Sequence, residues 1–76
     1  MKQKFGVIVK EKDSNYSVLY EGTENKLNDM LEVIKTTSNN KKARIIYVDK
    51  EEYNVSKHNM QELNKILKDS ENNEQS

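Results

Sequence analysis

The sequence predicts an α+β fold, a two-layer sandwich in the order β-β-α-β-α, with a three-stranded mixed sheet and two helices on one face. Two observations lead to this prediction. Short runs of β-branched and aromatic residues lie at 5–9, 16–20 and 43–48, and apolar residues at helical spacing follow the second and third runs. The chain has 76 residues, so we expect a single domain over residues 1–69.

The first two runs are expected to form an antiparallel hairpin. Residues 5–9 read Phe-Gly-Val-Ile-Val, and residues 11–15 are all polar, with the Asp, Ser and Asn that tight turns favour. In the second run, strict alternation places Tyr16, Val18 and Tyr20 on one face of the strand.

A helix is expected to begin after Gly22. Thr23 is a suitable N-cap, and Glu24 places a negative charge near the positive end of the helix dipole. The polar run at 36–40 ends the helix. Its apolar stripe follows the spacing i, i+3, i+4, i+7 and consists of Leu27, Met30, Leu31 and Ile34.

The third run, at 43–48, contains four consecutive residues without a charge, which is typical of a strand with both faces covered. A right-handed crossover through the first helix predicts that this strand lies parallel to a neighbour. The second helix is expected to begin near Ser56, where Val55 and Met60 have the spacing of a hydrophobic staple. Asn59 with Glu62 is an alternative capping pair.

From Asp69 onward the chain holds nothing apolar to bury, so residues 70–76 are expected to be a disordered tail. The hairpin, first helix and third strand together resemble half of a ferredoxin-like fold, and acylphosphatases have a comparable stretch. This resemblance concerns element order only. Because the chain has no glycine-rich anion loop and no arginine near the first strand, acylphosphatase chemistry is not implied.

The composition argues against an enzyme. The chain has one histidine, two glycines and no cysteine or proline, so no metal site or cofactor is expected. His58, with Glu62 four residues on, is the one pair that could be tested for acid–base chemistry. No run is long enough to span a membrane, and the apolar stretch at 5–9 is too short for a signal peptide, so we expect a cytoplasmic protein.

Helices on one side of the sheet would leave an apolar stripe on the other side, or a strand edge open to pair with another chain. Either feature predicts a protein partner or a homodimer, unless long lysine side chains shield the stripe. The predicted contact surface is this open face with an acidic loop at its rim. Its residues are Tyr47, Asp49, Glu51, Glu52 and Tyr53, with the two tyrosines as anchors.

The function expected from these features is a non-enzymatic protein-binding module. Phages and mobile elements often encode small lysine- and asparagine-rich domains that regulate or inhibit host proteins. By this association alone, the chain is expected to be such an accessory regulator or inhibitor. The alternative is nucleic-acid binding by Lys41, Lys42 and Arg44, with Tyr16, Tyr20 and Tyr47 stacking on bases. The 13 basic and 13 acidic residues cancel, so the basic excess that usually accompanies such binding is absent.

Overall fold

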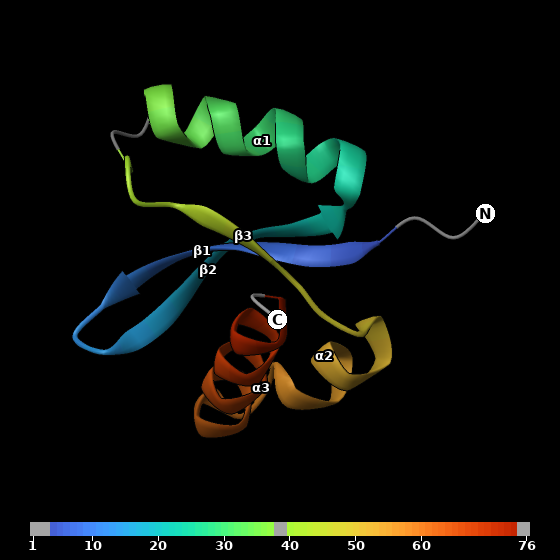
Figure 1. Ribbon diagram of the computed structural model, residues 1–76. Helices are drawn as coiled ribbons and strands as arrows, with labels where there is room; N and C mark the ends of the chain where they lie inside the picture. The colour runs from blue at the N-terminus through green and yellow to red at the C-terminus, as the bar shows by residue number, and fades with distance from the viewer. Residues whose placement is uncertain (1–3, 38–39, 75–76) are drawn as a thin grey trace.

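The computed structural model describes residues 4–37 and 40–74 and contains a three-stranded sheet and three helices (Figure 1). This confirms a small α+β fold in the predicted order, with two helices in place of the single last one. The elements are β1 (Phe5–Lys12), β2 (Asn15–Thr23), α1 (Glu24–Thr37), β3 (Arg44–Tyr47), α2 (Lys50–Ser56) and α3 (Met60–Glu74).

The sheet has the order β2-β1-β3, and both neighbouring pairs are antiparallel. The predicted mixed sheet is therefore wrong. β2 and β3 do run in the same direction, as a crossover through α1 requires, but β1 lies between them. β1 is the central strand, and Val7, Ile8 and Val9 within it are fully buried.

The β1–β2 hairpin is confirmed, and its turn consists of two residues. Asp13 and Ser14 have φ values of 55° and 69°. Two consecutive residues with positive φ are typical of a type I′ turn, whose twist matches that of the two strands.

A β-bulge interrupts the alternation along β2. Ile8 pairs with Tyr20 and Val9 with Val18, so Leu19 is left without a partner on β1. Tyr16 and Val18 contact the core on one side of the sheet, whereas Leu19 and Tyr20 contact the core on the other. The predicted common face of Tyr16, Val18 and Tyr20 is therefore wrong, because one extra residue reverses the alternation.

Helices cover both faces of the sheet, so the predicted two-layer arrangement is also wrong. α1 lies on one face, and α2 and α3 lie on the other (Figure 1). The α1-side core comprises Ile8, Leu27, Ile34 and Ala43, and the α3-side core comprises Val7, Val9, Tyr16, Ile46, Tyr53, Leu63, Ile66 and Leu67. Both faces of β1 and β3 are apolar, and a second helical layer is the arrangement that removes both from water.

The acidic segment after β3, expected as a loop, is the short helix α2. Ser56 is the last residue of α2, and α3 starts at Met60 after the alternative cap, Asn59. The Asn59 Oδ1 atom accepts hydrogen bonds from the backbone N–H groups of Gln61 and Glu62, at 3.0 and 3.3 Å. Val55 is 81% exposed, so the expected staple does not shield it.

α3 continues to Glu74, beyond the expected end of the domain at residue 69. Glu71 is held against β3 by Arg44, which gives the last turns of the helix a contact that apolar patterning does not predict. The expected tail is thus helical over residues 70–74, and residues 75 and 76 lie outside the described part.

Candidate functional site

Strand β3 separates the two charged groups that the sequence predicts as contact surfaces. Lys41 and Lys42 precede the strand, separated from it by Ala43, whereas Asp49, Glu51 and Glu52 follow its end. A four-residue strand is roughly 13 Å long, so the basic and acidic groups lie at opposite ends of the sheet and form two separate surfaces.

Arg44, the third residue of the predicted basic group, forms ion pairs with Glu71 and Glu11. Its Nε atom contacts Glu71 Oε2, and its Nη2 atom lies 3.1 Å from Glu71 Oε1 and 3.2 Å from Glu11 Oε1. The guanidinium also lies over the Tyr16 ring, at 5.4 Å from the centroid. We call Glu11, Tyr16, Arg44 and Glu71 the Arg44 cluster. Its charges are satisfied within the chain, so Arg44 contributes little to binding an external anion.

Tyr16 ties the Arg44 cluster to α3. Its hydroxyl donates a hydrogen bond to Glu71 Oε1 at 2.7 Å, and its backbone N–H donates to Asn64 Oδ1 at 2.6 Å. Burial, and then the neighbouring Glu71 carboxylate, raise the pKa of Tyr16. Hydrogen bonds from Arg44 and Tyr16 hold the pKa of Glu71 below its usual value. The Arg44 cluster therefore fastens the end of α3 to β1, β2 and β3.

This arrangement predicts a pH-dependent contribution of Glu71 to stability. Because the pKa of Glu71 is lower in the folded state, the contribution is complete above its unfolded pKa of about 4.3 and is lost as pH falls through the folded value. We expect Glu71→Gln to lower the free energy of unfolding by about 1 kcal/mol or less at neutral pH. The difference from wild type should shrink below pH 4, as measured by urea denaturation across a pH series.

The matched control is Glu32→Gln, because Glu32 is exposed, lies away from the N-terminus of α1, and its carboxylate forms no ion pair within the described residues. A destabilisation by Glu71→Gln that stays constant from neutral to acidic pH would contradict the assigned role of the carboxylate.

The tyrosines do not form an open platform on the sheet. Tyr16 is buried on the α3 side, whereas Tyr20 and Tyr47 pack half-buried against the α1-side core. The Lys4 ammonium lies 5.2 Å from the centroid of the Tyr47 ring. The sheet face that both sequence-based hypotheses required is therefore covered, and the three tyrosines are divided between its two sides.

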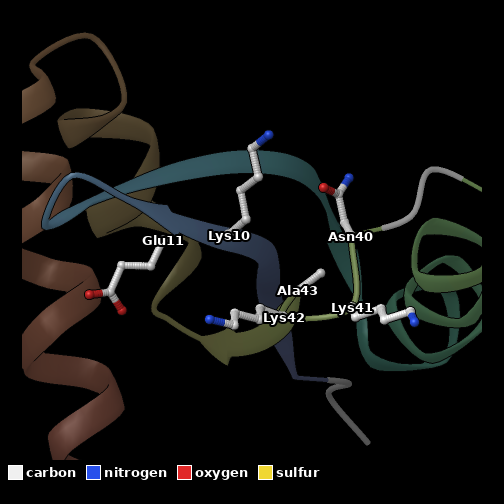
Figure 2. Close-up of a pocket in the computed structure, with 6 residues that line it drawn as sticks. All are labelled: Lys10, Glu11, Asn40, Lys41, Lys42 and Ala43. Carbon is white, nitrogen blue, oxygen red and sulfur yellow. The ribbon is translucent and has the colours of Figure 1, made fainter.

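The basic group forms part of a shallow pocket of about 430 Å³, which we call the lysine pocket. It lies where the end of β1 meets the turn into β3, and the Asn40 carbonyl closes that turn by accepting the Ala43 N–H at 3.1 Å. Sequence reasoning did not find Lys10 here, because its place beside the turn depends on the pairing of β1 with β3. The lining residues are Lys10, Glu11, Asn40, Lys41, Lys42 and Ala43 (Figure 2).

The acidic group is arranged around α2. Asp49 is the N-cap, and its Oδ1 atom accepts hydrogen bonds from the Glu51 and Glu52 N–H groups at 2.8 and 3.3 Å. Glu51 and Glu52 are exposed, but Tyr53, predicted as an anchor, is only 4% exposed in the α3-side core. Its ring centroid lies 5.7 Å from that of Phe5. Burial, and then Glu21, raise the pKa of Tyr53.

The candidate acid–base pair is not assembled. His58 is exposed in the turn between α2 and α3, and no hydrogen bond or ion pair joins it to Glu62 among the described residues. Within residues 4–37 and 40–74, no three histidine or acidic side chains gather in a way that could hold a metal ion. In the same part of the chain, no helix has the length and apolar character needed to cross a bilayer.

Comparisons with protein-family models, with curated proteins and with solved structures gave no match to this chain. The exposed surfaces of the chain are therefore the basis for assigning a function.

Proposed function

We propose that this chain is a non-enzymatic protein-binding module and that it contacts its partner through the outer side of α2. We define this α2 surface as Glu51, Glu52 and Val55. The observation that carries the proposal is the 81% exposure of Val55 on the same side of a helix as two exposed carboxylates.

The spacing within α2 supports this proposal. Val55 follows Glu51 by four residues and Glu52 by three, so the three side chains share one side of the helix. Tyr53 lies on the opposite side of α2 and is buried, and Ser56, three residues after Tyr53, is buried as well. A β-branched residue is a weak helix former, and an exposed one gains nothing from burial in this chain. A partner that covers Val55 would recover that apolar contact.

The charge of the α2 surface defines the chemistry of the partner. Two carboxylates beside a valine complement a protein surface that has lysine or arginine around a small apolar contact. A regulator or inhibitor of another protein, including the phage-type accessory proteins suggested by composition, would use such a surface.

Nucleic-acid binding is the weaker hypothesis. It needs aromatic rings on an open sheet face, and Tyr16 is buried while Tyr20 and Tyr47 are half-buried. It also needs Arg44, which is paired with Glu71 and Glu11. Homodimer formation through an open sheet face likewise loses its basis, because helices cover both faces. A second copy remains one of the proteins that the α2 surface could bind.

The test compares two double variants as immobilised bait. Glu52→Gln with Val55→Ser alters the α2 surface, and Glu32→Gln with Val33→Ser makes the same changes on the exposed side of α1. We expect the wild type and the α1 variant to retain the same protein from a lysate of the source cells, and the α2 variant to lose most of it. Circular dichroism spectra of all three proteins should coincide.

Light scattering over a range of protein concentrations completes the test, because it identifies a second copy as the partner. The proposal would be contradicted if the α2 variant retained the same proteins as the wild type. It would also be contradicted if retention disappeared after nuclease treatment, because the captured protein would then be held through nucleic acid.

A further inference from the structure

The lysine pocket, defined above by its six lining residues, gathers three positive charges from two distant parts of the chain. Lys10 comes from the end of β1, and Lys41 and Lys42 come from the turn that precedes β3. The antiparallel pairing of β1 with β3, in which Val9 faces Arg44, brings these segments together. The cluster is therefore a product of the fold rather than of one basic run.

These three lysines are not neutralised within the described residues. The ion pairs there belong to Arg44, and none includes Lys10, Lys41 or Lys42. Glu11 is the one carboxylate that lines the pocket, and its Oε1 atom is bound to Arg44 Nη2 at 3.2 Å. Figure 2 shows the Glu11 carboxylate turned toward α3 and away from Lys41. The lining therefore has three lysine charges against a single carboxylate, which is already paired with Arg44, in a chain whose net charge is zero.

The size and openness of the pocket indicate the form of the ligand. Its volume of about 430 Å³ falls within the range of small-molecule sites. The three ammonium groups extend in different directions around it, so they do not converge on one point (Figure 2). A lysine side chain has four flexible carbons and can turn toward a ligand, but three separated charges fit an elongated anion better than a single phosphate.

From this geometry, we propose that the lysine pocket binds a short chain of linked phosphates, with Lys10, Lys41 and Lys42 as the charged contacts. The Asn40 side-chain amide lines the same pocket and can donate a hydrogen bond to a phosphate oxygen. The site lies at the opposite end of β3 from the α2 surface, so ligand and protein partner can bind at the same time.

The test is calorimetric titration with inorganic tripolyphosphate at low ionic strength. Lys41→Gln with Lys42→Gln removes two contacts, and we expect affinity to fall about tenfold. Lys65→Gln with Lys68→Gln removes the same charge from the exposed side of α3 and should leave the affinity within about twofold of wild type. Lys10→Gln should weaken binding by a smaller factor than the double variant.

Three results would overturn the proposal. One is the absence of binding by the wild type, and another is an equal loss in the α3 control, which would indicate non-specific attraction to net charge. The third comes from a single-stranded oligonucleotide arm. If the oligonucleotide binds through Lys41 and Lys42 more tightly than tripolyphosphate at equal phosphate concentration, the pocket is a nucleic-acid contact instead.

Discussion

Replacing Leu67 with alanine is expected to leave much of the protein unfolded at room temperature. Leu67 is completely buried between α3 and the sheet. Removing a buried leucine side chain costs about 2–5 kcal/mol, because it loses apolar contacts and leaves a cavity. A core of this size supplies only about 3–5 kcal/mol in total. Urea denaturation followed by circular dichroism should show a folded baseline that is shortened or absent.

The control for this experiment is Val55→Ala, which removes an apolar side chain that is 81% exposed. It should change the free energy of unfolding by no more than about 0.5 kcal/mol. Leu27→Ala, on the α1 side of the sheet, should destabilise the chain as strongly as Leu67→Ala, because Leu27 is also fully buried. A Leu67→Ala protein with an unchanged denaturation midpoint would show that the α3-side core is not needed for folding.

The second large effect is expected at Gly6, where the addition of a single carbon forces atoms together. A Cβ at this position would lie 2.8 Å from the Ile46 carbonyl oxygen and 3.0 Å from side-chain atoms of Leu27 and Tyr47. The carbonyl belongs to the neighbouring strand and cannot move without disturbing the sheet. We therefore expect Gly6→Ala to lower the free energy of unfolding by about 1–3 kcal/mol, measured by urea denaturation.

Gly22→Ala is the matched control, since Gly22 pairs with Gly6 across the hairpin. Its Cβ would lie 3.3 Å from a ring carbon of Tyr20, a side chain that is half-buried and can shift. Alanine also lowers the conformational entropy of the unfolded chain, which favours folding and offsets part of the free-energy cost of that contact. The net change in the free energy of unfolding should therefore be small. Equal destabilisation by the two substitutions would mean that close approach to β3 is not what requires glycine at position 6.

Much of the fold could be predicted because local patterns determine it. α1 begins directly after Thr23 and buries Leu27 and Ile34 as its apolar spacing indicates. Side chains also alternate along β1 and β3, with Val7 and Ile46 on one side of the sheet and Ile8 and Ile45 on the other. The bulge at Leu19 could not be predicted, because it depends on register across the hairpin rather than on the order of residues in β2.

The helical state of the acidic segment after β3 could not be predicted, for a different reason. Three carboxylates within four positions resemble a solvated loop, and the helix signal is a single N-cap at Asp49 followed by one buried tyrosine. Tertiary packing decides which side of the sheet a helix covers. The location of α2 and α3 opposite α1 could therefore not be derived from the spacing of apolar residues. Arg44 pairs with Glu11 and Glu71, which lie 33 and 27 residues away from it in the sequence. No local sequence pattern indicates these ion pairs.

The sequence indicates the basic and acidic groups of the candidate surfaces, but not which neighbouring residues join them in the folded chain. Lys41, Lys42, Glu51 and Glu52 are exposed as such charges usually are. Tyr53 is buried in the α3-side core beside Phe5 and is therefore not accessible as an anchor. The spacing of Val55 and Met60 predicts a hydrophobic staple, but Val55 is exposed, because the cap lies at Asn59 and not at Ser56.

The bulge at Leu19 has a consequence for behaviour at high concentration. β2 is an edge strand of nine residues, and a long regular edge invites strands from other molecules to add to it and grow into aggregates. The bulge interrupts the even spacing of the backbone N–H and C=O groups on β2. Near the hairpin turn, the Tyr16 N–H already donates to Asn64 Oδ1 and is not available to another strand. An incoming strand would find only short regular stretches on either side of Leu19. The irregularity that defeats prediction from alternation thus favours solubility of the folded chain.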